Sequence, residues 1–115
     1  MVKDLTGTEL VELIDSGHPL TLVDALPESY YNQAHLPGAI NLVEPDVAAR
    51  AADVLPDRDR TVVTYCSNRA CGNSGAVARR LEALGYTDVR TYPDGIQDWV
   101  EAGRPVETGE TVVSA

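Results

Sequence analysis

The sequence predicts an α/β domain in which helices cover both faces of a parallel β-sheet. Short apolar runs, typical of buried strands, recur along the 115-residue chain, and segments of helical period separate them. Turn signals such as Pro37-Gly38 and Asp94-Gly95 mark the changes from one type of segment to the next. The length is that of one ordinary domain, which can bury a core of its own.

The N-terminal half is expected to alternate between helices and strands. Thr6 with Glu9 three residues later fits a capping box, so a helix should begin after Thr6 and end at Gly17. Four further elements are expected in this half: strands over 20–23 and 39–43, a helical turn over 28–33, and a helix that Asp46 caps and that runs to about Ala52.

The C-terminal half begins with the clearest strand, 61–65, in which every residue is β-branched or aromatic. The elements expected after it are a helix with Val77, Leu81 and Leu84 on its buried stripe, a strand over 89–92, and a last helix with Ile96 and Trp99 on one face. We expect a single domain over residues 1–107 and a C-terminal tail over 108–115.

Composition excludes several classes of function. The net charge of −9 and the pI near 4.4 argue against nucleic acids and anionic membranes as partners. No apolar run approaches the roughly 18 residues that a membrane span requires, and the first ten residues lack a signal-peptide core. We expect a soluble, cytoplasmic protein with reduced thiols. His18 and His35 are dispersed and lack zinc-site spacing, so neither a metal nor another cofactor is expected.

Both cysteines lie where the strand over 61–65 ends and a glycine-bearing loop opens into a helix. A thiol at the carboxyl end of a strand, near backbone amides and a helix N-terminus, lies in a positive potential that favours the thiolate. We therefore expect Cys66 to be the catalytic nucleophile, with Arg69 adding a cation beside it. The residues expected to bind an anionic substrate are those of the loop: Ser67, Asn68, Arg69, Ala70, Cys71, Gly72 and Asn73.

These residues also have ordinary structural interpretations. Cys66 could be a small buried hydrophobic residue at a strand end. Cys71 is either an inert loop residue or a resolving thiol that forms a disulfide with Cys66. His35 could pair with the thiol as a base, although a histidine before such a turn more often orders the loop. Asp24 could reach the same rim as Cys66, or serve as a cap or turn residue.

Three segments of the chain resemble the rhodanese-like family. Residues 22–42, LVDALPESYYNQAHLPGAINL, are similar to its early motif, which ends in a His-x-Pro-Gly-Ala step. Residues 62–86, VVTYCSNRACGNSGAVARRLEALGY, resemble its active-site strand, loop and helix. Residues 92–107, YPDGIQDWVEAGRPVE, resemble its C-terminal Gly-x3-Trp-x2-Ala-Gly-x-Pro signature. The resemblance covers most of the chain in the right order.

The resemblance implies a five-stranded parallel sheet and a sulfurtransferase or persulfide carrier that uses Cys66. By analogy Cys66 takes a sulfane sulfur from a small anionic donor such as thiosulfate or a mercapto acid, and passes it to cyanide, a thiol or a protein acceptor. The loop departs from the family pattern, because Arg69 and Cys71 stand where a Gly and an Arg are usual. Leu26 likewise replaces a frequent Arg.

Two other classes of function stay open at the level of sequence. A related branch of the family hydrolyses phosphate esters or reduces arsenate, but phosphoryl transfer favours an Arg six residues after the cysteine, where this chain has Gly72. Reduction of arsenate or a disulfide through Cys66 and Cys71 is therefore more plausible than phosphatase activity. The third class is a non-catalytic module that binds a protein or senses redox state through its two thiols. The oligomeric state is not predicted.

Overall fold

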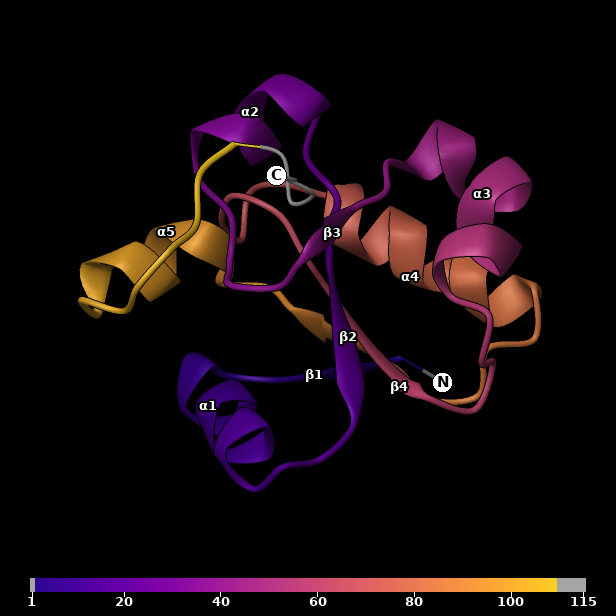
Figure 1. Cartoon of the computed structure of the whole chain (residues 1–115), viewed down its shortest axis with the longest axis horizontal. Helices are drawn as coiled ribbons and strands as arrows, with labels where there is room; N and C mark the ends of the chain where they lie inside the picture. The colour runs from indigo at the N-terminus through magenta and orange to yellow at the C-terminus, as the bar shows by residue number, and fades with distance from the viewer. Residues whose placement is uncertain (1, 110–115) are drawn as a thin grey trace.

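Five strands form a single parallel sheet in the computed structural model, which describes residues 2–109 (Figure 1). The strands are β1 (Lys3–Asp4), β2 (Leu20–Asp24), β3 (Ile40–Asn41), β4 (Thr61–Tyr65) and β5 (Val89–Tyr92). Their order across the sheet is β1-β5-β4-β2-β3, and every neighbouring pair is parallel. The α/β class and the parallel sheet predicted from the sequence are confirmed.

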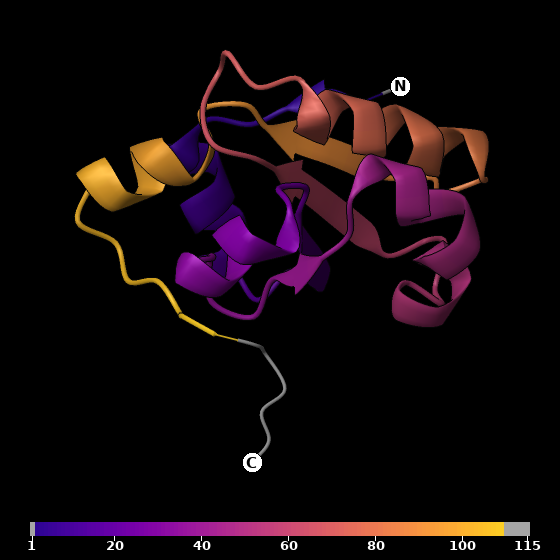
Figure 2. The same cartoon turned by 90° about the horizontal axis from the view of Figure 1, so that it is seen from above.

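The helices lie on both faces of the sheet, as Figure 2 shows. They are α1 (Gly7–Asp15), α2 (Glu28–Gln33), α3 (Val47–Val54), α4 (Asn73–Ala83) and α5 (Gly95–Glu101), with a short 3₁₀ turn, η1 (Glu44–Asp46), before α3. Helices α3 and α4 cover one face, and α1, α2 and α5 cover the other. Each face has its own cluster of buried side chains.

Strand β4 lies at the centre of the sheet, and every residue in it is buried. Its side chains alternate between the two clusters, as the period of two in a strand requires. Val62 packs with α3 and α4, whereas Val63 and Tyr65 pack with the helices of the opposite face. Cys66, the next residue, therefore points toward α4. The alternation places this thiol at the carboxyl end of the sheet, beside the start of a helix.

The predicted start of the first helix is confirmed in detail. Thr6 Oγ1 accepts a hydrogen bond from the backbone N–H of Glu9 at 3.1 Å, and Glu9 Oε1 accepts one from the N–H of Thr6 at 2.9 Å. Two N–H groups that would lack a helical partner are thereby satisfied. The chain leaves the helix through Gly17, whose φ of +78° is left-handed.

Four details differ from the sequence-based expectation. The strand expected over 39–43 pairs only at Ile40–Asn41, because its partner β2 ends at Asp24, which lies opposite Asn41. Asp46 stands at the N-cap of α3, but its side chain makes no capping hydrogen bond, since the 3₁₀ turn precedes the helix directly. Leu84 is 36% exposed at the C-cap of α4 and not on its buried stripe. The residue pattern did not predict β1.

The segment after α5 runs back along α2. His35 and Glu107 form an antiparallel bridge through two backbone hydrogen bonds of 2.9 Å, and Gly109 donates to the carbonyl of Asn32 at 2.7 Å. Residues 110–115 of the predicted tail lie outside the described part of the chain. Within residues 2–109 no helix is long and apolar enough to cross a bilayer.

Candidate active site

The loop between β4 and α4 is anchored at its start by helix α5. The carbonyl of Cys66 accepts the N–H of Ile96 at 2.9 Å, and the carbonyl of Ser67 accepts the N–H of Gln97 at 3.0 Å. This close approach depends on Gly95, which has a φ of +69°. A Cβ atom there would lie 2.6 Å from the carbonyl oxygen of Ser67 and closer still to that of Cys66. Helix α5 therefore fixes where the loop begins.

Asn68 turns the loop back toward the strand. Its Oδ1 accepts the N–H of Ala70 at 2.9 Å, its carbonyl accepts the N–H of Cys71 at 3.0 Å, and its Nδ2 donates to Gln97 Oε1 at 2.8 Å. This Asx-type turn is a local structure that asparagine favours. As a result the backbone of Cys71 returns to the side chain of Cys66.

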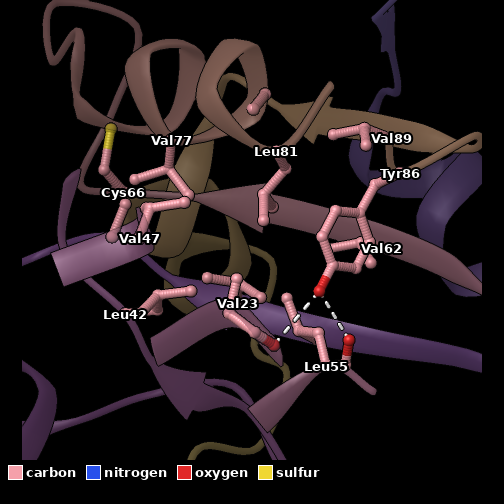
Figure 3. Close-up of a cluster of buried hydrophobic side chains, with 13 residues drawn as sticks. Val23, Leu42, Val47, Leu55, Val62, Cys66, Val77, Leu81, Tyr86 and Val89 are labelled. Atoms are coloured by element: carbon pink, nitrogen blue, oxygen red, sulfur yellow. Dashed lines mark hydrogen bonds between the residues drawn. The ribbon is translucent and has the colours of Figure 1, made fainter. Parts of the chain in front are cut away.

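Cys66 is buried below this turn, with 1% of its surface exposed. In Figure 3 its sulfur stands at the end of the apolar cluster, next to Val77 of α4. The sulfur lies 3.4 Å from the carbonyl oxygen of Cys71 and 3.5 Å from Ser74 Oγ. Ser74 belongs to the first turn of α4, and its carbonyl accepts a 2.9 Å hydrogen bond from Thr64 of the active-site strand.

The surroundings of Cys66 raise the pKa of its thiol. Burial raises the pKa of this thiol, and the hydrogen bond between it and the Cys71 side chain raises it further. Hydrogen bonds with the side chain and backbone of Ser74 act in the opposite direction without cancelling the burial. The expectation of a free thiolate at Cys66 is therefore not met in this conformation of the loop.

Cys71 has the opposite electrostatic environment. Burial opposes its ionisation, but hydrogen bonds from the Cys66 thiol, from the backbone N–H groups of Asn73 and Ser67, and from the Ser67 side chain outweigh it and lower the pKa of Cys71. The hydrogen bonds that were expected to favour an anion at Cys66 thus favour the thiolate of Cys71. Of the two thiols, Cys71 is the more acidic.

A cavity of about 540 Å³ lies against this side of the loop. Cys71, Gly72, Ser74 and Arg79 line it, together with acidic residues that include Asp4. The carbonyl oxygen of Cys71 and the hydroxyl of Ser74 both contact the Cys66 sulfur, so two residues that line the cavity also contact this thiol. The cavity provides the space in which a small anion could approach the thiols.

Arg69 is on the outer side of the loop. Its guanidinium is 67% exposed, and its Nε forms a 2.6 Å ion pair with Asp94 Oδ1. The Asp94 carboxylate therefore compensates the positive charge of Arg69, which was expected to attract an anionic substrate. Ala70 is exposed beside it, whereas Gly72 is the N-cap of α4 and Asn73 Nδ2 donates to the carbonyl of Ala25 at 3.3 Å. Within the loop, Cys71 and Gly72 therefore line the cavity, whereas Arg69 and Ala70 are exposed on the outer side.

Asp24 is at the same end of the sheet as Cys66, but its side chain serves the opposite face. Its Oδ2 accepts the hydroxyl of Tyr65 at 2.9 Å, its Oδ1 accepts the N–H of Leu26 at 2.8 Å, and Tyr65 in turn accepts the N–H of Leu36 at 3.0 Å. Burial raises the pKa of this carboxyl, and these hydrogen bonds oppose the rise. The geometry is that of a turn residue which fixes the loops after β2 and α2.

His35 orders the chain between α2 and β3. The ring is 1% exposed, stacks on Tyr31 with 3.9 Å between ring centroids, and has Nδ1 2.8 Å from the carbonyl oxygen of Tyr31. Its Nε2 faces Glu107 Oε1 at 3.7 Å. These contacts agree with the interpretation that His35 orders the loop. The polar groups in contact with the Cys66 sulfur come instead from Cys71 and Ser74.

Three residues that the sequence did not single out contribute to the site. Ser74 contacts the Cys66 sulfur, Arg79 lines the cavity, and Gly95 admits the loop carbonyls. The sequence shows a serine at the start of a helix and a glycine after Asp94, but it does not show that both of these residues contact the region of Cys66. Among residues 2–109 no group of three His, Cys, Asp or Glu side chains is arranged to hold a metal ion.

Comparisons with known proteins place this geometry in a family. The family model described as Rhodanese-like domain matches residues 6–102. Thiosulfate sulfurtransferase PspE of Escherichia coli is 36% identical over 76 residues, which cover 66% of this chain and 70% of that protein. The Saccharomyces cerevisiae thiosulfate:glutathione sulfurtransferase is 32% identical over 98 residues, covering 73% and 67%. The chain belongs to the rhodanese-like family.

Two further matches differ in extent. The HTH-type transcriptional regulator Rv0324 of Mycobacterium tuberculosis is 35% identical over 108 residues, which are 94% of this chain. The matched region is 46% of that regulator, so the chain spans about half its length. Among solved structures, the BH2092 protein from Bacillus halodurans superposes with a TM-score of 0.83 at 23% identity, covering 92% of this chain and 77% of that chain. This last likeness shows the fold.

Proposed function

We propose that this protein is a sulfurtransferase whose Cys66 carries the transferred sulfur as a persulfide. The observation that carries the proposal is the place of Cys66, at the carboxyl end of the central strand with its sulfur against the first turn of α4. A helix N-terminus stabilises an anionic sulfur. The names of the Escherichia coli and yeast relatives indicate thiosulfate as the donor, and the yeast name indicates a small thiol as an acceptor.

The first step is attack of Cys66 on the donor. The Cys66 thiol first gives its proton to the neighbouring Cys71 thiolate, the form that the lowered pKa of Cys71 favours. The Cys66 thiolate then attacks the sulfane sulfur of thiosulfate, a bond forms between the two sulfurs, and sulfite leaves with the electron pair of the broken sulfur–sulfur bond. The donor approaches from the cavity lined by Cys71, Ser74 and Arg79, whose guanidinium is a cationic group among lining residues that also include Asp4 and Glu82.

The second step returns the enzyme to its starting state. Cyanide or an external thiolate attacks the outer sulfur of the persulfide, and Cys66 leaves as a thiolate. The hydrogen-bond donors at the start of α4 stabilise this anion in both steps, which is the electrostatic contribution that a preorganised site makes.

The experiment that tests this function measures sulfite. Reduced protein, freed of reductant and mixed with thiosulfate under anaerobic conditions, should release one sulfite per chain in a rapid phase. The isosteric Cys66→Ser variant should release none, because a hydroxyl at this position is a much poorer nucleophile than a thiolate. Sulfite release by Cys66→Ser equal to that of the unmodified protein would refute the role of Cys66.

A further inference from the structure

The Cys71 side chain has no assigned role in sulfur transfer beyond accepting the proton of Cys66, yet the loop is built around it. Its own N–H donates to the carbonyl of Asn68 at 3.0 Å, and hydrogen bonds with the backbone of Ser67 and Asn73 and with the Ser67 side chain lower the pKa of its thiol. A serine, an alanine or the usual arginine at this position would not place an ionisable sulfur at the centre of these hydrogen bonds. The structure therefore holds a second nucleophile directly beside the first.

The two cysteines are in contact. The Cys66 sulfur lies 3.4 Å from the carbonyl oxygen of Cys71, and a hydrogen bond between the two side chains lowers the pKa of Cys71. The turn at Asn68 maintains this approach, since the N–H of Cys71 is bonded to the carbonyl of Asn68 at 3.0 Å. A disulfide bond requires the two sulfurs to approach to about 2 Å, and the Cys66 sulfur already lies against the backbone of Cys71.

We propose that Cys71 resolves the Cys66 persulfide, so that the protein releases hydrosulfide and functions as a sulfane-sulfur reductase coupled to thiol oxidation. This inference rests on the proposed function, because the persulfide must form first. Cys71 first passes the proton that it received from Cys66 to the outer sulfur, which gives Cys66–S–SH, and the Cys71 thiolate then attacks the inner sulfur of this persulfide. A Cys66–Cys71 disulfide forms, the bond to the outer sulfur breaks, and HS⁻ leaves with that electron pair.

The balance of the reaction defines its co-reactant. The transferred sulfur gains two electrons on becoming hydrosulfide, and the two cysteines lose them on becoming a disulfide. Two equivalents of a small thiol must then reduce the disulfide, forming the oxidised thiol and two cysteine thiols. The cavity gives such a thiol a route to the sulfur of Cys71, which lines it, whereas Cys66 is buried.

The lowered pKa of Cys71 supports this assignment of roles. At neutral pH the attacking group in a thiol exchange is the thiolate, and the cradle of N–H groups favours that form at Cys71. The buried Cys66 is the less acidic of the two and is the partner that accepts sulfur. The pair thus combines an attacking thiolate and a protected sulfur carrier within one loop.

A single-turnover experiment tests the inference. Reduced protein without added thiol is mixed with excess thiosulfate under anaerobic conditions, and sulfite, sulfide and intact mass are measured. The unmodified protein should release one sulfite and one sulfide per chain and become two hydrogens lighter, with no free thiol. Cys71→Ser should still release one sulfite per chain at its own rate, release no sulfide, and become one sulfur heavier.

Two controls make the outcome specific. An equimolar mixture of Cys66→Ser and Cys71→Ser should release sulfite but no sulfide, because the exchange is intramolecular. Sulfide from this mixture at the rate of the unmodified protein would overturn the proposal. Sulfite without sulfide from the unmodified protein, with the added sulfur retained, would also overturn it and leave the proposed function intact. Absence of sulfite from both single variants and the unmodified protein would instead refute the proposed function.

Discussion

The carbonyl oxygen of Cys71 lies 3.4 Å from the sulfur of Cys66 and accepts the hydrogen bond of its thiol. The five-residue separation of these cysteines in sequence becomes a contact because the loop turns at Asn68 and is held by α5. The contact makes the two sulfurs a pair with different acidities. It also shows that the second cysteine belongs to the inner side of the loop.

The order of the two acidities can be measured by alkylation. We expect iodoacetamide to modify Cys71 with a pH midpoint below the ordinary cysteine value of about 8.5, and Cys66 with a midpoint above it. The sign follows from the structure, since N–H donors stabilise the Cys71 thiolate and burial disfavours the Cys66 thiolate. Peptide mapping across a pH series provides the measurement. In urea the two midpoints should coincide, and Cys66 reacting first in the folded protein would contradict the expectation.

Gly95 should be intolerant of any side chain. Gly95→Ala combines a left-handed φ with a Cβ atom 2.6 Å from the Ser67 carbonyl oxygen, so we expect a loss of at least about 2 kcal/mol in unfolding free energy. Urea denaturation measures it. The matched control is Gly103→Ala, where φ is +77° but no atom lies within 4 Å of the added Cβ. This control should lose only about 1 kcal/mol, and equal losses would show that the approach of the loop is unimportant.

The hydroxyl of Tyr65 should contribute strongly to stability. Tyr65→Phe leaves the Asp24 carboxylate and the N–H of Leu36 without this partner in a buried region, which should cost about 2–4 kcal/mol. Tyr86→Phe is the matched control, because its buried hydroxyl donates to the neutral carbonyls of Ala51 and Leu55 (Figure 3). We expect about 1 kcal/mol there. A Tyr65→Phe loss no larger than the control would contradict the role assigned to Asp24.

The Arg69–Asp94 pair should limit the attraction of anionic donors. Asp94→Asn removes the carboxylate that compensates the guanidinium, so the KM for thiosulfate should fall by about twofold at low salt and return toward its original value as salt rises. Initial rates at several salt concentrations provide the test. Adding Arg69→Ala to Asp94→Asn should abolish the gain, and a gain that persists in the double variant would assign it to another group.

The fold was predictable wherever a local pattern determines it. The residue pattern identified β4 and β5 with the bounds that the structure gives, and the capping box located α1. Strand β1 was not predicted, because Lys3 and Asp4 are both exposed and show no apolar alternation. Their pairing with β5 depends on residues more than 80 positions away, which no short window can contain.

The candidate site was predictable in its location and less so in its arrangement. The strand-loop-helix pattern identified Cys66 and the loop as its centre. The sequence could not show that Asp94 neutralises Arg69, that Ser74 contacts Cys66, or that hydrogen bonds favour the thiolate of Cys71. Each of these depends on how the loop folds back on itself and on α5. The spacing of the cysteines alone was compatible with an inert or a resolving Cys71.

The most direct test of the central claim maps the transferred sulfur in a protein that cannot resolve it. Cys71→Ser is treated with thiosulfate, alkylated and digested, and the position of the added sulfur is determined by mass spectrometry. We predict a gain of one sulfur per chain, located on Cys66, and no gain in the Cys66→Ser/Cys71→Ser double variant. No added sulfur on Cys66 of Cys71→Ser, or the same gain in the double variant, would contradict Cys66 as the sulfur carrier.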